Sequence, residues 1–268
     1  MILAILQARM SSTRLPGKVL IPILGEPMLF RQIERLKRCQ SFDRLVVATS
    51  TESTDDQLVQ ACRVRGVDVS RGSIDDVLDR FVMAAKPYDP QTIVRLTGDC
   101  PLIDPGVVDN VVKFFASGDY DYASNVSPPT FPDGLDVEVM RASCLERAHQ
   151  EAKLPSEREH VTPYLRNHPE LFRHGNYSGP RDLSHLRWTV DEPEDFEFVS
   201  HVFERLYQQN PQFGLDDILG LLEQDPAIGA LNSAIKRNQG MEKSLTSDAD
   251  FKKRAGAGKH QHSSGKIP

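Results

Sequence analysis

A loop rich in cations and hydroxyl groups follows the first apolar run of the chain. Residues 7–20 read QARMSSTRLPGKVL, and their candidate phosphate-binding side chains are Arg9, Ser11, Ser12, Thr13, Arg14 and Lys18. Arginine offers a planar fork of N–H donors and lysine a mobile point charge, and both suit phosphate oxygens. Open α/β sheets bind ligands at the carboxyl ends of their strands, so this loop is predicted to bind a triphosphate.

The Gly17-Lys18 pair does not make this loop a P-loop. That motif requires a glycine five positions before Gly17 and Ser or Thr after the lysine, whereas these positions hold Ser12 and Val19. Gly17 would instead let the backbone approach a ligand closely. The alternative interpretation is a surface loop of solvated charges, because charged loops are common.

Two aspartates follow later strand-like runs. Asp99 ends the run in VRLTGDCPLIDP, and Asp191 ends the run in LRWTVDEPEDF. Mg²⁺ takes oxygen ligands and shares its coordination sphere with substrate oxygens and water, so the two carboxylates could clamp one metal ion against phosphates. The alternative for Asp191 is a helix N-cap. Helix-start roles, as a cap or opposite the helix dipole, are predicted for Asp104, Glu194 and Asp195.

The cysteines indicate neither a metal site nor a redox site. Cys39, Cys62, Cys100 and Cys144 are widely spaced and form no CxxC pair, which disfavours structural zinc and a disulfide framework. Cys100 follows Asp99 but has no obvious base beside it in the sequence, which argues against a nucleophile. Buried free thiols are expected.

The elements that must position these side chains alternate in the first half of the chain. Apolar, β-branched runs at 1–6, 44–49 and 92–96 are predicted strands, and the segments between them repeat apolar residues every three or four positions, as amphipathic helices do. This alternation predicts a βαβ fold with parallel strands. The carboxyl ends of these strands would bring the opening loop and Asp99 to one edge of the sheet.

After residue 105, predicted strands and helices no longer alternate regularly. Helices are predicted at 107–118, 143–153, near 157–166 and at 193–209, and short strands at 120–124, 135–140 and 186–190. This half is interpreted as a mixed-sheet elaboration that holds a second substrate. The apolar period fades after about residue 236, so the chain is predicted to form one domain, 1–235, with a disordered tail at 236–268 that carries His260 and His262.

The composition argues against some classes of function. Charged residues make up 26% of the chain and the formal net charge is −6, with no long basic stretch, so a nucleic-acid partner is not expected. No apolar run approaches about 18 residues, and the opening residues lack a signal-peptide pattern, so a cytoplasmic location without membrane association is predicted. Small-molecule substrates are the expectation.

Five segments in the same order resemble the cytidylyltransferase family that includes spore-coat polysaccharide biosynthesis protein F and is related to the acylneuraminate and Kdo cytidylyltransferases. They are QARMSSTRLPGKVL, RGSIDDVLDRF, LTGDCPLIDP, SEREHVTPYL and LRWTVDEPEDF, and the resemblance covers roughly residues 2–222. It implies a single-domain nucleotide-diphospho-sugar transferase fold. That fold is Rossmann-like and related to A-type glycosyltransferases, with a mainly parallel mixed sheet flanked by helices.

The resemblance also implies that the chain uses CTP and a divalent metal ion, Mg²⁺ or Mn²⁺. It assigns the triphosphate to Arg9, Ser12, Arg14 and Lys18, and the metal ion to Asp99 and Asp191.

The segment RGSIDDVLDRF lies where these enzymes read the cytosine. Arg71, Gly72 and Ser73 are therefore candidates for base recognition, with Asp76 a weaker one. The alternative is an ordinary turn between a strand and a helix, in which Ser73 serves as the N-cap.

The resemblance implies that the second half holds the acceptor. The candidate contacts are Asp136, Glu138, Arg158, His160 and Arg187. Asp136 and Glu138 alternate and would share one strand face, where they could bind hydroxyl groups or an amine. Either arginine could bind a carboxylate. The alternative is that Arg158 is a solvated charge and His160 a helix histidine with satisfied hydrogen bonds.

Together these assignments imply that the chain joins CMP from CTP to a sugar or sugar acid and releases pyrophosphate, for cell-surface polysaccharide or glycan biosynthesis. The acceptor hydroxyl would attack the α-phosphorus in line, while Arg9, Arg14, Lys18 and the metal ion neutralise the developing charge. The opening loop has serine and threonine where the sialic-acid branch has glycines, which leaves the acceptor open. A homodimer is implied by the resemblance alone.

Two alternatives use the same fold. A glycosyltransferase would consume a nucleotide-sugar, but LTGDCP holds Asp99 without the DxD motif of such enzymes, and the cationic loop suits a free triphosphate better. A nucleotide-binding protein without catalysis would carry the same residues. The presence of both metal aspartates and Lys18 argues against it.

Overall fold

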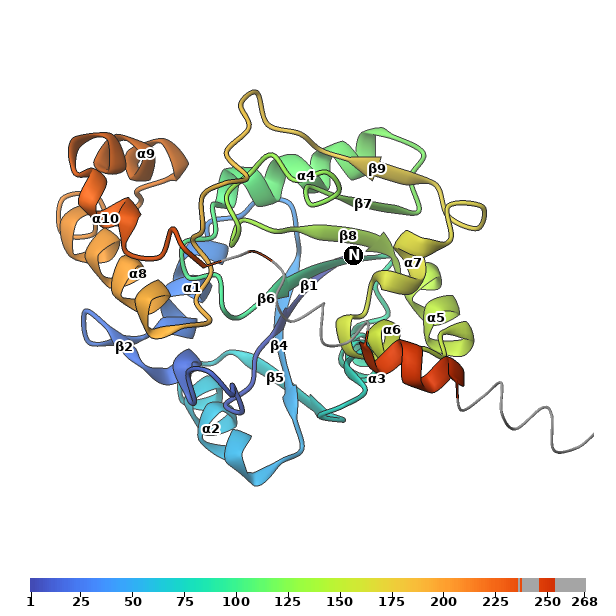
Figure 1. Ribbon diagram of the computed structural model, residues 1–268. Helices are drawn as coiled ribbons and strands as arrows, with labels where there is room; N and C mark the ends of the chain where they lie inside the picture. Colours follow the sequence, from blue (N-terminus) through green and yellow to red (C-terminus); the bar gives the residue numbers. More distant parts are fainter. Residues whose placement is uncertain (236, 238–245, 254–268) are drawn as a thin grey trace, which may run out of the picture.

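The computed structural model describes residues 1–235, 237 and 246–253. A seven-stranded sheet forms the middle layer, in the strand order β5-β4-β1-β6-β8-β7-β9 (Figure 1). The strands are β1 Ile2–Gln7, β4 Arg44–Ser50, β5 Asp68–Gly72, β6 Thr92–Thr97, β7 Tyr122–Ser124, β8 Glu138–Arg141 and β9 His174–Asn176. Two further short strands, β2 Pro22–Ile23 and β3 Glu26–Pro27, form a separate hairpin. The predicted α/β class with a mainly parallel mixed sheet is confirmed.

Helices cover both faces of this sheet. One buried cluster includes Ile33, Val108 and Phe198 and lies under α1, α4 and α8. The other includes Phe81 and Leu145 and lies under α3 and α5. Apolar side chains of β1 are buried against both clusters, as expected for a parallel strand covered by helices on each side. The helices are α1 Met28–Leu36, α2 Asp56–Val64, α3 Val77–Ala85, α4 Pro105–Ser117, α5 Ala142–Glu151, α6 Pro155–His160, α7 Pro163–Asn167, α8 Pro193–Leu206, α9 Leu215–Gln224 and α10 Pro226–Ala230.

The strand order reverses between β1 and β6. From β1 the chain builds β4 and then β5 on one side, and it returns to place β6 on the other side of β1, with all four strands parallel. The loops that follow β1 and β6 therefore diverge from adjacent strand ends. Such a switch point is the usual ligand crevice of an open α/β sheet.

The second half extends the sheet with mixed pairing. β8 runs antiparallel to both β6 and β7, and β9 runs parallel to β7. The predicted strand at 186–190 is not a strand, because only an isolated bridge between Asp133 and Arg187 forms there. Backbone hydrogen bonds nevertheless fix this segment, from Trp188 N to Asp133 O at 2.6 Å and from Val190 N to Asp99 O at 2.8 Å. The segment thus reaches the end of β6.

Other differences from the sequence prediction have local causes. β5 was not predicted, because none of its residues is fully buried and its apolar pattern is weak. The single helix expected near 157–166 is broken into α6 and α7, since Val161 between them has φ +73° and Pro163 starts the second helix. None of the described helices is both long and apolar enough to cross a membrane.

The predicted unstructured tail is partly ordered. Residues 246–253 form a helix, and Asp248 accepts hydrogen bonds from the Ser156 backbone N–H at 2.9 Å and the Ser156 hydroxyl at 2.6 Å. These contacts fasten the segment to the start of α6. Apart from Arg237, the remainder of the predicted tail, including His260 and His262, lies outside the described residues.

Gly134 is required for the close approach of the 186–190 segment. Its φ is +108°, and a Cβ at this position would lie 2.6 Å from Thr189 N and 2.7 Å from Trp188 C. Gly134→Ala should therefore lower the free energy of unfolding by about 2 kcal/mol or more, because both backbone strain and overpacking oppose it. Denaturant unfolding measures this change.

Gly220→Ala is the matched control. Gly220 lies inside α9 and a Cβ there meets nothing within 4 Å, so alanine should stabilise the helix by roughly 0.5–1 kcal/mol. Equal stability of the two variants would contradict the role assigned to Gly134.

Candidate active site

Three chain segments meet at the switch point around the side chain of Lys18. Its Nζ donates to Val190 O at 2.6 Å and to Asp191 Oδ1 at 2.9 Å, and it lies 3.5 Å from Asp99 Oδ2. The loop after β1 thus contacts both the loop after β6 and the 186–190 segment. The two aspartates predicted to bind a metal converge on one ammonium group.

Lys18 and Asp191 each stabilise the charged form of the other. Burial alone would lower the pKa of Lys18, but Asp99 and Asp191 outweigh burial and raise it. Burial alone would likewise raise the pKa of Asp191, yet Lys18 and Arg14 lower it. The site therefore holds a protonated amine between two carboxylates.

Two arginines also contact Asp191 and its neighbour. Arg14 Nη2 lies 2.9 Å from Asp191 Oδ2, and Arg14 Nε lies 2.8 Å from Glu192 Oε1. Arg187 Nη2 reaches Asp191 Oδ2 at 3.4 Å. The N-cap of α8 is Glu192, so Asp191 is not the cap. Asp195 in the first turn accepts the Asp191 and Glu192 backbone N–H groups at 2.9 and 3.0 Å, in line with its predicted helix-start role.

The donor set fits a divalent metal ion bound jointly with a substrate. Asp99 and Asp191 both approach one point, now marked by the Lys18 ammonium. No group of three or more His, Cys, Asp or Glu side chains among the described residues is arranged to hold a metal. Mg²⁺ commonly binds one or two protein carboxylates and takes its other ligands from phosphates and water. Two converging aspartates suit that kind of site.

Asp55 connects the cationic loop to the end of β4 through hydrogen bonds. It accepts the Met10 backbone N–H at 2.7 Å, the Thr49 hydroxyl at 2.8 Å and the Ser50 backbone N–H at 2.9 Å. Burial alone would raise the pKa of Asp55, but these hydrogen bonds lower it. Asp55 is fully buried and was not identified from the sequence, where DDQL reads only as the start of a helix.

The cationic loop contains a tight turn at Gly17. Gly17 has φ +72°, and its N–H donates to Met10 O at 2.9 Å. Ser12 Oγ accepts the Leu15 backbone N–H at 3.3 Å, whereas the Ser11 hydroxyl is buried without a hydrogen-bond partner in the described part of the chain. From this loop, Arg14 and Lys18 both reach Asp191 at the switch point.

Residues of the segment predicted to recognise the base form hydrogen bonds and an ion pair within the protein. Arg71 donates to Ser50 O and Glu52 O, each at 2.9 Å, and pairs with Asp56 at 2.6 Å. Ser73 is not the N-cap of α3, although its hydroxyl accepts the Asp76 backbone N–H at 3.0 Å.

The cap of α3 is Asp76, whose carboxylate accepts the Asp79 backbone N–H at 2.9 Å. Asp76 also pairs with Arg158, whose Nε lies 2.9 Å from Asp76 Oδ2. Two residues predicted to touch different substrates therefore contact each other.

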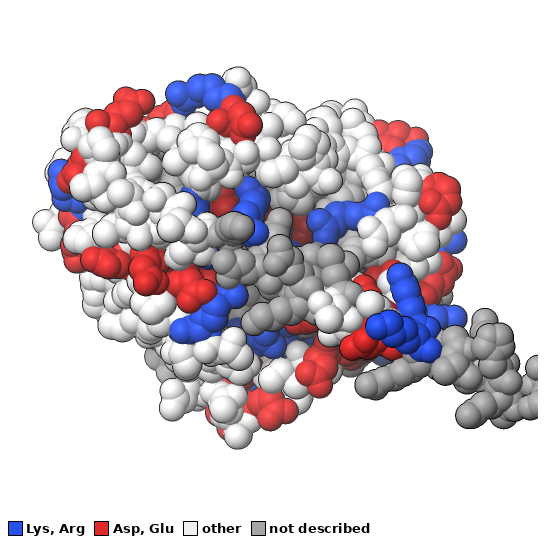
Figure 2. Space-filling model, in the orientation of Figure 1, with Lys and Arg blue, Asp and Glu red and all other residues white. Residues whose placement is uncertain are grey.

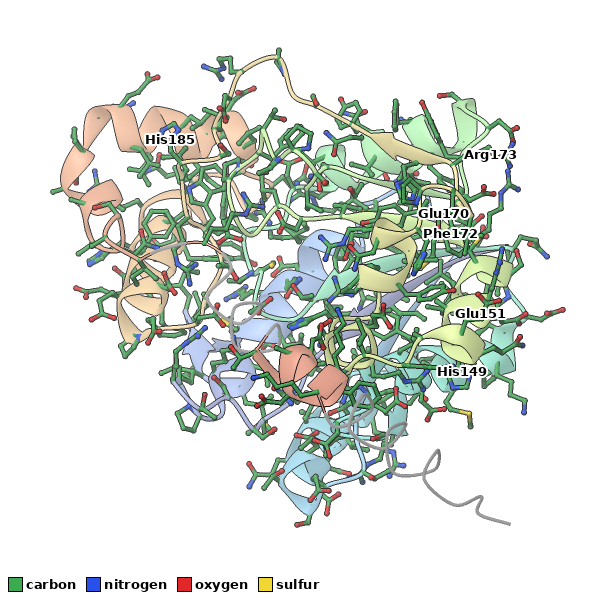
Figure 3. All side chains as sticks on the ribbon, turned by 45° about the vertical axis from the view of Figure 1, so that its right-hand side comes forward. His149, Glu151, Glu170, Phe172, Arg173 and His185 are labelled. Carbon is green, nitrogen blue, oxygen red and sulfur yellow. The ribbon has the colours of Figure 1, made fainter. Side chains whose placement is uncertain are left out.

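The acceptor candidates divide into separate groups. Arg158 also donates to His149 O at 2.7 Å, on the α5 side of the molecule. Arg187 follows His185 by two residues, and Figure 3 places His149 and His185 on opposite sides of the molecule. The guanidinium of Arg187 is bound to Asp195 at 2.8 Å and Asp133 at 3.1 Å rather than free for an acceptor. The two arginines do not form one anion-binding pair.

Glu138 lies in a buried polar cluster on β8. Arg95 stands opposite it in the register with β6 and forms an ion pair with it, and the Tyr122 hydroxyl donates to it. Burial alone would raise the pKa of Glu138, but Arg95 and Arg166 lower it. His160 borders this cluster, and its pKa is lowered first by burial and then by the same two arginines.

Asp136 precedes β8 by two residues. Arg237 Nη2 contacts Asp136 Oδ1 at 2.6 Å. Desolvation, with smaller effects of Asp133 and Glu138, raises the pKa of Asp136 to about 7 in spite of that arginine. In the face of the molecule that Figure 2 shows, acidic and basic side chains lie around the middle. Arg237 was not identified from the sequence, where it stands in a stretch without an apolar pattern.

Comparison with known proteins identifies the family of the chain. The family model described as cytidylyltransferase matches residues 3–225. The spore coat polysaccharide biosynthesis protein SpsF of Bacillus subtilis is 37% identical over 84% of this chain and 95% of its own length. The 3-deoxy-manno-octulosonate cytidylyltransferase of Acinetobacter baumannii is 31% identical over 74% of this chain and 83% of its own.

A solved structure of a related protein has the same fold as this chain. A cytidylyltransferase from Leptospira borgpetersenii superposes with a TM-score of 0.82 at 36% identity, over 88% of this chain and 99% of the other. With its switch-point cluster of cations and aspartates, the chain therefore belongs to the cytidylyltransferase family and is a nucleotidyltransferase.

Proposed function

We propose that this nucleotidyltransferase transfers the cytidylyl group of CTP to a hydroxyl of a sugar or sugar acid and releases pyrophosphate. The observation that carries the proposal is the convergence of Lys18, Asp99 and Asp191 at the switch point. A triphosphate needs cations, and a phosphate-bound metal ion needs carboxylates, so one site meets both needs. SpsF and the Acinetobacter enzyme support a sugar-derived acceptor through their names.

Asp99 and Asp191 would hold the divalent ion, Mg²⁺ or Mn²⁺. Bound there, the ion would neutralise charge on the phosphate oxygens as the bond to the leaving pyrophosphate breaks. Arg14 and Lys18 lie beside this position, where Asp191 pairs with both. When the ion takes the place of the Lys18 ammonium between the carboxylates, the N–H groups of both side chains would turn to the phosphates. Attack by the acceptor hydroxyl in line with the leaving group would need only positioning and charge neutralisation from the protein.

The acceptor would lie beyond the metal position, toward Asp136 and the Glu138 cluster. Asp136 lies close enough to Glu138 to interact electrostatically, and its partly exposed carboxylate offers an acceptor for sugar hydroxyls, whereas Glu138 is buried and bonded to Arg95 and Tyr122. We further propose that the product serves cell-surface polysaccharide or glycan biosynthesis. The homodimer and the cytoplasmic location stay predictions from the sequence.

The two metal aspartates can be tested by Asp99→Asn and Asp191→Asn. Each should reduce pyrophosphate release from CTP at least about 100-fold with an active acceptor, because charge neutralisation at the transferring phosphate is lost. A screen of Kdo, acylneuraminates and simpler sugars supplies that acceptor. Asp216→Asn is the control, since the Asp216 side chain is 94% exposed and lies outside the site. Wild-type rates in either site variant would refute the metal assignment.

Nucleotide choice can be measured as thermal stabilisation in the presence of Mg²⁺. CTP should raise the melting temperature more than UTP, GTP or ATP, since a ligand at one hundred times its Kd stabilises the native state by about 2.7 kcal/mol. Lys18→Met should diminish the CTP effect. A response to UDP- or GDP-sugars and not to CTP would point to a glycosyltransferase reaction instead.

The pH dependence of acceptor binding tests the place given to Asp136. Its pKa of about 7 means that the carboxylate is ionised above neutrality, where it accepts stronger hydrogen bonds from hydroxyl groups. The KM for the acceptor should therefore rise as the pH falls through about 7, and Asp136→Asn should remove this dependence. Because Arg237 lowers this pKa, Arg237→Gln should move the midpoint to higher pH. If neither substitution alters the pH dependence of the KM for the acceptor, Asp136 is not the group whose titration causes it.

A further inference from the structure

Lys18 occupies the point at which the two proposed metal ligands meet. Its ammonium group has three N–H donors, and three oxygen atoms surround it: Val190 O at 2.6 Å, Asp191 Oδ1 at 2.9 Å and Asp99 Oδ2 at 3.5 Å. The Lys18 side chain is buried, whereas both aspartate side chains are partly exposed. In the free protein, the ammonium group therefore serves as a counter-ion of both carboxylates.

Both carboxylate oxygens of Asp191 are engaged by cations of the chain. Oδ1 accepts from Lys18, and Oδ2 pairs with Arg14 at 2.9 Å and with Arg187 at 3.4 Å. A divalent ion at Asp191 would be repelled by these like charges. At least one of the three cations must therefore move away when a metal ion binds there.

Lys18 is the cation that a bridging metal ion would replace. Across the described residues, it is the only lysine or arginine that pairs with both Asp99 and Asp191. Arg14 and Arg187 pair with Asp191 but have their further partners elsewhere. An ion held by both aspartates thus takes the place of the Lys18 ammonium group.

The Lys18 side chain can leave this position without a change in the main chain of its loop. Backbone hydrogen bonds from Leu20 N to Gly17 O at 2.9 Å and from Ile21 N to Lys18 O at 3.1 Å hold the main chain around it. A lysine has a flexible four-carbon stem, so the ammonium group can turn from the aspartates toward the crevice. A triphosphate there supplies the acceptors that the ammonium group gives up.

We propose that Lys18 fills the metal position in the free protein and leaves it when a triphosphate binds. This inference rests on the proposed use of CTP and a divalent ion. The triphosphate draws the ammonium group away and adds phosphate oxygens as metal ligands, so it raises the affinity of the two aspartates for the ion. By thermodynamic linkage, the ion raises the affinity for the nucleotide by the same factor. The protein therefore binds the ion together with the nucleotide rather than alone.

Binding of Mn²⁺ in the absence of nucleotide, measured by electron paramagnetic resonance of the free ion, tests this role. The wild-type protein should bind Mn²⁺ weakly, because Lys18 competes for both aspartates. Lys18→Met removes the charge and keeps an unbranched side chain, so it should bind Mn²⁺ roughly 5- to 150-fold more tightly, the usual range of coupling between two ligands. Lys37→Met is the control, because Lys37 is exposed at the C-terminal end of α1.

Two further variants locate the effect. Arg14→Met removes a cation that pairs with Asp191 and Glu192, and it should raise the affinity for Mn²⁺ less than Lys18→Met does. Addition of Asp99→Asn to Lys18→Met should abolish the gain, since one of the two carboxylates is lost. Equal gains in the Arg14 and Lys18 variants, or no gain in Lys18→Met, would overturn the proposal.

Thermal stability gives a second measurement. Lys18→Met removes a counter-ion of Asp99 and Asp191, so its melting temperature should fall, and Mn²⁺ alone should restore much of the loss. The wild-type protein should gain little from Mn²⁺ alone and clearly more from Mn²⁺ with CTP. Tight binding of Mn²⁺ by the wild-type protein without nucleotide would overturn the proposal even if the variant does not fold. Failure of the wild-type protein to bind CTP would instead refute the proposed function.

Discussion

The ion cluster around Asp191 is the constraint on which the rest of the site depends. Lys18 and Arg14 contact Asp191 from the loop after β1, and Arg187 contacts it from the segment that carries it. Arg187 in turn binds Asp195 in the first turn of α8. Removing one member of such a partly buried cluster leaves an uncompensated charge, so its members hold one another in place. The same charges that order the free protein are those that a triphosphate and a metal ion require.

The arginines near the crevice illustrate how contacts separate structural from functional roles. Arg71 joins the ends of β4 and α2 through two carbonyl oxygens and Asp56, and Arg158 joins α6 to the cap of α3 through Asp76. Each is satisfied within the protein. Arg80 differs from both: it is more deeply buried, and two of its nitrogens have no hydrogen-bond partner among the described residues.

The proposed acceptor side includes contacts from residues beyond the family match. Asn232 donates to Arg187 O at 3.0 Å and to Asp195 Oδ1 at 2.9 Å, and Arg237 contacts Asp136, while the family match ends at residue 225. The residues proposed to bind the triphosphate and the metal ion, from Arg9 to Asp191, all lie within that match. The charge next to Asp136 therefore depends on a segment after the matched residues.

The sequence by itself determined the fold class, the strand ends that form the crevice, and the meeting of the Lys18 loop with Asp99. These follow from local patterns: apolar periodicity fixes the elements, and the carboxyl ends of parallel strands meet at one edge. Asp191 was added by the family resemblance, and the strand expected to end at it did not form. Only the tertiary structure decided which charged side chains are available to ligands. Arg187 and Asp195, Asp76 and Arg158, and Asp136 and Arg237 are 8, 82 and 101 residues apart. Such pairings depend on packing between distant elements, and a sequence records the charge of each residue but not the partner that neutralises it.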